Sequence, residues 1–268
     1  MKVPRNVLSV ATGAALQAGR IIMEGYGNVR EVQTKQYHDF VTEIDKRSEE
    51  CIIQHLERAF PSHGILAEES GASERSGSFR WIIDPLDGTT NFIHGIPLFA
   101  VSIALEVEGV LEVGVVYEPI RKELFTAQRG RGAFLNDRKI RVSKTNDLQR
   151  CVMATGFPFR NFDLIDGYLK SFRRFMTEVS GIRRPGSAAL DLCYLAAGRY
   201  DGFWELNLNP WDMAAGALLI REAGGKITTF SGGDDFLARG NVVGSNTLIH
   251  DWMLGLLRES FEENINLL

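Results

Sequence analysis

The chain has 268 residues, of which 34 are acidic and 30 are basic, and its formal net charge is −4. Hydrophobic residues make up 44% and charged residues 24%, a composition that argues against disorder and fits one large domain or two closely packed ones. The slight acidity gives no overall electrostatic reason to bind nucleic acid directly. No apolar run approaches the length of a transmembrane helix, so we expect no membrane partner.

Cysteine usage bears on the compartment. The three cysteines are far apart, odd in number and set in apolar surroundings: Cys51, Cys151 and Cys193. This pattern favours buried free thiols in a reducing compartment over a disulfide framework or a zinc site. We therefore expect a cytoplasmic protein.

The first predicted element is a helix. Apolar residues recur at helical spacing from Val7 to Ile22, which predicts an amphipathic helix over residues 7–22. The same segment loosely resembles a signal peptide, with early positive charge and small residues near Ala18. Because Thr12 and Gln17 interrupt its apolar stretch, we favour a helix of the fold over a cleaved leader.

Residues 25–149 are predicted to be rich in strands. A glycine-bearing loop over residues 25–35 precedes a second helix, which Thr42 and Asp45 begin as a cap and Pro61 ends. Short apolar segments then predict strands, among them "GILAEE" and "FRWIID". "FAVSIALEV" and "VLEVGVVYEP" are expected to be antiparallel neighbours, and "FLNDRKIRV" is expected to form a hairpin.

From about residue 150 strands and helices alternate. The pattern predicts strands over 152–155, 202–205, 226–230 and near 241–244, and helices over 164–179, 187–197 and 211–222, followed by a closing helix. Such interleaving indicates layered sheets and helices, an α/β architecture. We expect one unit, 1–268, made of a metal- and phosphate-binding α+β part, 1–149, and an α/β part, 150–268, with a cleft between them.

The stretch "WIIDPLDGTTNF" is the first candidate site. Asp84 and Asp87 stand at the end of a predicted strand, where open α/β sheets commonly place ligands. Two carboxylates so close repel each other unless a cation lies between them, and hard oxygen donors favour Mg²⁺ or Mn²⁺ over zinc. Gly88, Thr89 and Thr90 offer backbone N–H groups and hydroxyls suited to a phosphate.

Two other readings of this stretch are open from the residues alone. Pro, Asp and Gly all form turns, so "DPLDGT" could be a plain surface turn. An aspartyl-phosphate phosphatase is the second alternative, in which one aspartate attacks phosphorus and another acts as the acid. There one residue separates the two aspartates, whereas two residues separate Asp84 from Asp87, which would misplace the acid.

Three other stretches add carboxylates that strengthen the interpretation as a site. "LAEES" ends a predicted strand in Glu68 and Glu69, and "FVTEID" places Asp45 early in a helix. "NPWDMAAG" places Asp212 in the first turn of another helix, which Pro210 helps to start and whose dipole favours a carboxylate. Each acid alone is more often a cap or a solvated charge. Together they could supply ligands for two or three divalent ions.

These motifs together resemble the inositol monophosphatase family. "DFVTEID", "EES", "WIIDPLDGTTNF", "RRPGSAALDL" and "PWDMAAG" follow the family's order and approximate spacing almost from end to end, most closely that of bacterial members of the inositol-1-monophosphatase and extragenic suppressor type. The resemblance implies a five-layered αβαβα sandwich of the inositol monophosphatase and fructose-1,6-bisphosphatase type. It also implies a Mg²⁺-dependent, lithium-sensitive phosphatase that forms a homodimer.

The resemblance also implies roles for individual residues. Its metal ligands match Glu68, Asp84, the carbonyl of Leu86, Asp87 and Asp212. Its catalytic residues, which orient or deprotonate the attacking water, match Asp45, Glu68 and Thr89. Its substrate contacts match Asp87, Gly88, Thr89, Gly186, Ser187, Ala188, Glu205 and Asp212. Ser187 could equally be a helix N-cap, and both roles can hold at once.

Two classes of function follow from the resemblance. The first is hydrolysis of myo-inositol 1-phosphate or a related sugar phosphate by a metal-activated water, with a broader specificity that includes fructose 1,6-bisphosphate as an alternative. Glu205 and "GSAAL" suit a polyol better than a nucleotide. The second class is contact with the transcription machinery, for which Arg173, Arg174, Arg183 and Arg184 are the candidates. Those arginines could also be a solvated face.

Overall fold

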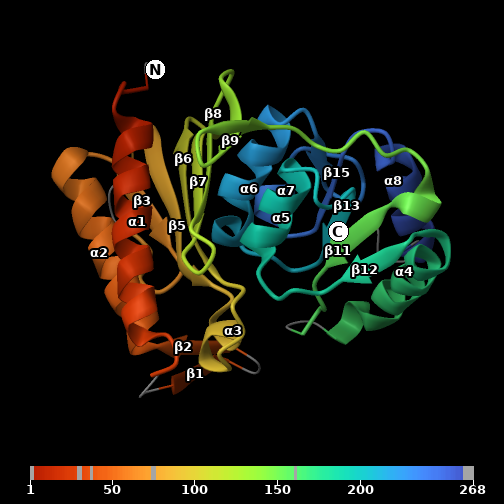
Figure 1. Ribbon diagram of the computed structural model, residues 1–268, viewed down its shortest axis with the longest axis horizontal. Helices are drawn as coiled ribbons and strands as arrows, with labels where there is room; N and C mark the ends of the chain where they lie inside the picture. The colour runs from red at the N-terminus through yellow and green to blue at the C-terminus, as the bar shows by residue number, and fades with distance from the viewer. Residues whose placement is uncertain (1–2, 29–31, 37–38, 74–76, 160–161, 262–268) are drawn as a thin grey trace.

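The computed structural model describes residues 3–28, 32–36, 39–73, 77–159 and 162–261. Its elements stack in five layers, which Figure 1 shows from left to right as helices, a sheet, helices, a second sheet and helices. The αβαβα sandwich expected from the resemblance is therefore confirmed. Within the described ranges, no helix combines the length and the apolar character needed to cross a bilayer.

The first helical layer packs on one face of the larger sheet. It consists of α1 (Val7–Gly25) and α2 (Glu43–Ala59). Their buried residues recur at helical spacing, so each helix turns one apolar stripe towards the sheet. The expected cap of α2 is present, because Thr42 and Asp45 bond to each other's backbone as a capping box.

The larger sheet has eight strands in the order β10-β9-β8-β7-β6-β5-β3-β4. Their bounds are β3 (Gly64–Ala67), β4 (Gly71–Ala72), β5 (Phe79–Asp87), β6 (Ala100–Val107), β7 (Val110–Glu118), β8 (Glu123–Gln128), β9 (Gly132–Leu135) and β10 (Arg138–Ile140). β6 and β7 are antiparallel neighbours, and β9 and β10 form the predicted hairpin. At that hairpin, Asn136 and Asp137 have φ values of 46° and 64°, which suits a tight primed turn.

One local prediction was wrong. The segment expected to be a loop to residue 35 ends in a strand, β1 (Val32–Gln36), which pairs antiparallel with β2 (Asp39–Thr42). The pair forms a separate two-stranded sheet. A five-residue helix, α3 (Thr89–Ile93), follows β5 and lies near this pair in Figure 1.

The middle layer consists of α5 (Ala188–Ala196) and α6 (Pro210–Glu222), which pack between the two sheets. All nine residues of α5 are buried. A helix that is apolar all round is stable only where it is covered on every side. The two helices therefore belong to the core that joins the sheets.

The smaller sheet has the strand order β12-β11-β13-β15-β14. The bounds are β11 (Val152–Thr155), β12 (Gly181–Arg183), β13 (Gly202–Glu205), β14 (Lys226–Thr228) and β15 (Val242–Ser245). Alternate residues on these strands face opposite layers: Phe203 packs towards α5 and α6, whereas Trp204 packs towards the outer helices.

The last layer consists of α4 (Ile165–Glu178) and α8 (His250–Ser260), which cover the outer face of the smaller sheet. The remaining elements are short: η1 (Leu148–Arg150), η2 (Phe162–Leu164) and α7 (Phe236–Arg239). The predicted strands and helices beyond residue 150 are all present, with bounds that differ from expectation by one or two residues.

Candidate active site

A bulge at the end of β5 places Asp84 and Asp87 on the same face of the larger sheet. Asp84 pairs with Ser102 of β6 and Asp87 pairs with Ala100, so three steps along β5 match two along β6. In a regular strand, side chains three residues apart face opposite sides of the sheet. The extra residue in the bulge brings Asp87 back to the side that Asp84 faces. Both carboxylates therefore face the middle helical layer, and both line one cavity.

Glu68 joins them from the neighbouring parallel strand. Ala67 of β3 pairs with Ile83 of β5, and the Glu68 amide donates to the Ile83 carbonyl at 3.1 Å. Glu68 thus lies beside Asp84, one step further along both strands. The Glu68 side chain lines the same cavity.

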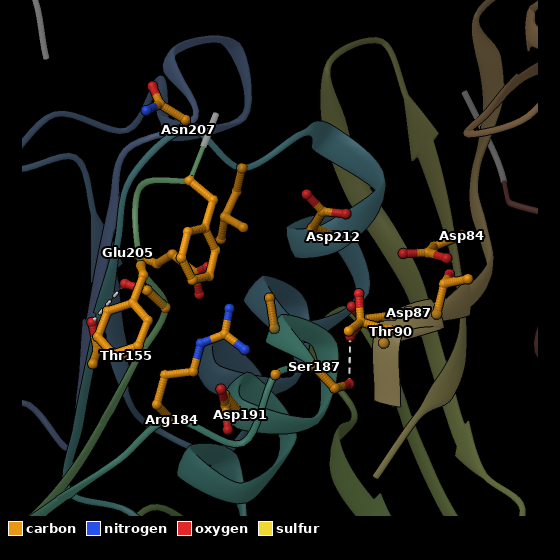
Figure 2. Close-up of a pocket in the computed structure, with 18 of the residues that line it drawn as sticks. Asp84, Asp87, Thr90, Thr155, Arg184, Ser187, Asp191, Glu205, Asn207 and Asp212 are labelled. Atoms are coloured by element: carbon orange, nitrogen blue, oxygen red, sulfur yellow. Dashed lines mark hydrogen bonds between the residues drawn. The ribbon is translucent and has the colours of Figure 1, made fainter. Parts of the chain in front are cut away.

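Asp212 enters from the start of α6. Its Oδ2 accepts a hydrogen bond from the Asn209 amide at 2.7 Å, and Pro210 occupies the first helical position. The hydroxyl of Ser102 donates to the Trp211 carbonyl at 3.2 Å, which ties this end of α6 to the strand that pairs with Asp84. Figure 2 shows Asp212, Asp84 and Asp87 lying around one space.

Thr89 connects the cavity to Asp45. Its Oγ1 lies 2.9 Å from Asp45 Oδ1 and 3.0 Å from the Leu86 carbonyl, and its one hydroxyl hydrogen can be donated to either. The other oxygen of Asp45 accepts bonds from the Thr42 amide, at 2.8 Å, and the Thr42 hydroxyl, at 2.5 Å. Asp45 is fully buried, and burial raises the pKa of its carboxyl while the bonds from Thr42 and Thr89 lower it. Thr89 lines the cavity and Asp45 does not, so the Thr89 hydroxyl links Asp45 to the cavity.

The start of α5 holds Asp87. Ser187 Oγ donates to Asp87 Oδ2 at 2.5 Å, and the Ala189 amide donates to the same oxygen at 2.7 Å. Ser187 also caps α5, because its hydroxyl accepts from the Leu190 amide at 3.4 Å. Burial raises the pKa of Asp87 to about 6, with the bonds from Ser187 and Ala189 acting in the opposite direction.

Gly88 allows the backbone to turn between the acids and Thr89. Its φ is 94°, and a Cβ at this position would lie 2.9 Å from the Leu98 carbonyl oxygen. Both the left-handed backbone and the lack of space require glycine. The turn exposes Gly88, Thr89 and Thr90 to the cavity.

The cavity itself has a volume of about 470 Å³ and runs from the acids across to β11 and β13. It brings together nearly all the predicted site residues: Glu68, Asp84, Leu86, Asp87, Gly88, Thr89, Gly186, Ser187, Ala188, Glu205 and Asp212. Glu205 lies far from the acids in Figure 2, on the wall made by the smaller sheet. A Cβ at Gly156 would lie 1.7 Å from Glu205 Oε1, so glycine at 156 makes room for that carboxylate.

Sequence reasoning missed part of the far wall. Phe157, Phe159, Arg184 and Asp191 line the cavity beside Glu205. The segment "GFPF" directly after a predicted strand was the available signal, since strand ends carry ligand contacts in such sheets. Nothing local to "SAALDL" indicates that Asp191 lines a cavity, because it lies inside a fully buried helix.

The arginines considered for a partner contact do not form one patch. Arg184 lines the cavity, and Arg174 is paired with Glu259 at 2.9 Å and with Glu178 at 3.8 Å. Arg173 is exposed on α4 next to the exposed Leu169. Arg183 is exposed at the end of β12, and its Nη1 donates to the Ile182 carbonyl at 3.2 Å. Of the two arginines on α4, Arg173 is the better placed for an external contact.

Comparison with known proteins matches this geometry. The model of the inositol monophosphatase family matches residues 3–262. The chain belongs to the inositol monophosphatase family. It is 50% identical over 248 residues to a Nus factor SuhB of Pseudomonas aeruginosa, in an alignment that covers 90% of this chain and 92% of the relative. It is 48% identical over 256 residues to an inositol-1-monophosphatase of Mesorhizobium japonicum, in an alignment that covers 94% of this chain and 96% of the relative. The crystal structure of an extragenic suppressor protein suhB from Bartonella henselae superposes with a TM-score of 0.91 at 49% identity, covering 94% of this chain and 98% of that one.

The inositol monophosphatase family generally uses divalent metal ions, and the donor set here fits such ions. Burial and repulsion from Glu68, Asp87 and Asp212 raise the pKa of Asp84 well above its usual range. A bound cation would offset this repulsion between the carboxylates. Among the described residues, no three acidic, His or Cys side chains are gathered as closely as a preformed cage requires. Mg²⁺ keeps several waters and needs one or two carboxylates, so the cluster suits it without a cage.

Proposed function

We propose that the protein hydrolyses myo-inositol 1-phosphate, or a related polyol phosphate, to the alcohol and phosphate in the presence of Mg²⁺. The observation that carries the proposal is the single cavity that joins the acids of β3, β5 and α6 to the polar wall at Glu205. Phosphate chemistry needs the acids, and recognition of an alcohol needs the far wall.

The metal ligands in this proposal are Glu68, Asp84, Asp87, Asp212 and the carbonyl of Leu86. When bound there, two or three Mg²⁺ ions, or Mn²⁺, would lower the pKa of a coordinated water and offset charge on the phosphoryl oxygens. The backbone N–H groups of Gly88 and Thr89 would bind the phosphoryl oxygens, since the turn at Gly88 exposes them to the cavity.

Thr89 is proposed to position the attacking water. With its hydroxyl hydrogen donated to Asp45 or to the Leu86 carbonyl, Thr89 can accept a hydrogen bond from that water through an oxygen lone pair. Glu68, which lines the cavity next to Asp84, would take the one proton that the water loses, as the general base. At the other end, Glu205 together with Gly186, Ser187 and Ala188 would bind the hydroxyls of the alcohol.

The test is phosphate release with Mg²⁺ from inositol 1-phosphate, fructose 1,6-bisphosphate, histidinol phosphate and adenosine 3′,5′-bisphosphate. We expect phosphate release to be fastest from inositol 1-phosphate. Asp84→Asn should abolish this activity, Li⁺ should reduce it, and Asp166→Ala should retain it. Asp166 is an exposed residue in the first turn of α4 and does not line the cavity. Turnover of fructose 1,6-bisphosphate at a similar rate would establish the broader specificity instead. Activity on none of the four esters would contradict the proposal.

A second proposed role is contact with the transcription machinery, supported by the relative from Pseudomonas aeruginosa that carries the name Nus factor. The exposed face of α4 at Leu169 and Arg173 is the proposed surface. Leu169→Ser with Arg173→Glu should abolish co-purification with transcription complexes and leave phosphate release unchanged. Unchanged co-purification would remove this surface. The homodimer that the family suggests is tested by sedimentation.

A further inference from the structure

Asp191 has a buried carboxyl oxygen, Oδ1, without a hydrogen-bond partner among the described residues. The residue lies in the first turn of α5, is 1% exposed and lines the cavity. Since buried polar atoms are nearly always paired, and an unpaired buried carboxyl oxygen costs stability, this exception needs a functional reason.

Arg184 lies on the same wall as Asp191. Its guanidinium stacks over Phe157 and Phe159, 5.3 Å from each ring centre. Within the described ranges it takes part in no ion pair. Figure 2 shows Arg184 and Asp191 together on the side of the cavity away from Asp84. This wall of the cavity therefore has an acceptor oxygen without a hydrogen-bond partner and, near it, a guanidinium outside any ion pair of the described residues, beside two aromatic rings.

We propose that Asp191 and Arg184 form a subsite that binds a ring hydroxyl of the substrate's alcohol part, which makes Asp191 a specificity-determining residue. A hydroxyl donates one hydrogen bond and accepts others, so it can pair with both groups at once. Phe157 and Phe159 offer an apolar surface for the ring carbons. The inference rests on the proposed function, because it assigns the alcohol end of the same cavity.

A structural role for Asp191 makes the opposite prediction for stability. Burial, with repulsion from Glu205 and Asp87, raises the pKa of the Asp191 carboxyl well above its usual range, and the charge of Arg184 acts in the opposite direction without cancelling this rise. Removing a side chain that is repelled and has an unpaired buried oxygen relieves this cost. The melting temperature of Asp191→Ala should therefore equal or exceed that of the wild type, whereas loss of a structural contact would lower it.

The kinetic test compares inositol 1-phosphate with cyclohexyl phosphate, which has the ring but no hydroxyls. Asp191→Ala should raise KM for inositol 1-phosphate about tenfold, with kcat within about twofold. The same variant should leave kcat/KM for cyclohexyl phosphate within about twofold, and Asp166→Ala should leave both substrates unchanged. Asp191→Asn, which keeps one acceptor oxygen, should be intermediate. Equal losses on both substrates, or no loss on either, overturn the proposal.

A binding measurement separates this inference from the proposed function. The phosphonate analogue of inositol 1-phosphate resists hydrolysis, and methylphosphonate carries the same acid without the ring. Calorimetric titration with each phosphonate, in the presence of Mg²⁺, measures the two affinities. Asp191→Ala should weaken binding of the inositol phosphonate about tenfold and leave binding of methylphosphonate unchanged. If the wild type hydrolyses no ester but this difference persists, the proposed function falls and the subsite stands. If the wild type binds the two phosphonates equally, the subsite is wrong.

Discussion

The buried carboxylate of Glu49 accepts a hydrogen bond from the Ser70 amide, with 2.9 Å between Oε1 and N. Its other oxygen accepts from the Glu69 amide at 2.8 Å. These bonds hold the turn that directly follows Glu68. We expect Glu49→Gln to weaken divalent-ion binding about tenfold, because the amide donor faces a backbone N–H and displaces the turn. The affinity for Mn²⁺ is measured by titration in the absence of substrate, with free Mn²⁺ detected by electron paramagnetic resonance.

The matched control for that change is Glu50→Gln. Glu50 is the next residue of α2, is exposed, and accepts a hydrogen bond from Gln54 on the same helix. Its Mn²⁺ affinity should equal that of the wild type. Equal affinities for both variants would show that the turn holds Glu68 without Glu49.

Thr89 is predicted to govern turnover rather than substrate binding. Thr89→Val keeps the shape of the side chain but removes the hydroxyl that links the cavity to Asp45. We expect kcat to fall at least about a hundredfold with KM little changed. Thr89→Ser keeps the hydroxyl and should retain most of the activity. Steady-state kinetics that show similar kcat values for the two variants would contradict the role of the hydroxyl.

Gly156 is predicted to control the alcohol end of the cavity. The Cβ of Gly156→Ala would overlap Glu205 Oε1 and must displace that carboxylate. KM for inositol 1-phosphate should rise about tenfold. Gly255→Ala is the control, because a Cβ at Gly255 in α8 meets nothing within 4 Å; its kinetics should match those of the wild type. An unchanged KM in Gly156→Ala would show that Glu205 has no part in recognition.

Chelation should distinguish Asp84 from an ordinary buried polar residue. Burial and like-charge repulsion raise its pKa, so its carboxyl destabilises the protein without a cation. In EDTA we expect Asp84→Asn to melt at a higher temperature than the wild type. In excess Mg²⁺ the wild type should gain stability by mass action and the variant should gain less. Thermal melts of both proteins in the two buffers measure this. If Mg²⁺ raised the melting temperature of both proteins by the same amount, Asp84 would have no role in metal binding.

His250 is predicted to make the protein sensitive to mild acid. It is fully buried, its Nε2 lies 3.0 Å from Thr228 Oγ1 and its Nδ1 lies 2.9 Å from Ser245 Oγ. Burial, followed by repulsion from Lys226, lowers its pKa to about 4. Because this value lies below the ordinary 6.5, the unfolded chain binds a proton first as pH falls. The stability contributed by His250 is thus present above pH 6.5 and is lost towards pH 4.

The magnitude of this loss is about 3 kcal/mol when it is complete. Urea unfolding at pH 7, 5.5 and 4.5 should show a steeper loss in the wild type than in His250→Gln. The difference between the two proteins isolates His250 from the buried carboxyls, which titrate with the opposite sign. Parallel pH profiles would show that His250 keeps an ordinary pKa.

Much of the fold could be predicted because its signals are local. The stripe of α1, the capping box at Thr42 and Asp45, and the start of α6 at Pro210 depend on residues within one or two turns. β1 could not be predicted in this way. Its short polar sequence lacks apolar alternation, and it becomes a strand because β2 supplies hydrogen-bond partners.

The sequence by itself determined the chemistry: hard carboxylates beside small hydroxyls and a flexible glycine, in motifs of one family. Tertiary structure decided which of them meet. The interval between Asp84 and Asp87 would send them to opposite faces of a regular strand, and the bulge against β6 brings them to one. The far wall, with Arg184 over two phenylalanines and Asp191 Oδ1 without a partner among the described residues, forms where the segments after β11 and β12 meet the start of α5. Burial and strand pairing are non-local, so no short stretch of sequence encodes them.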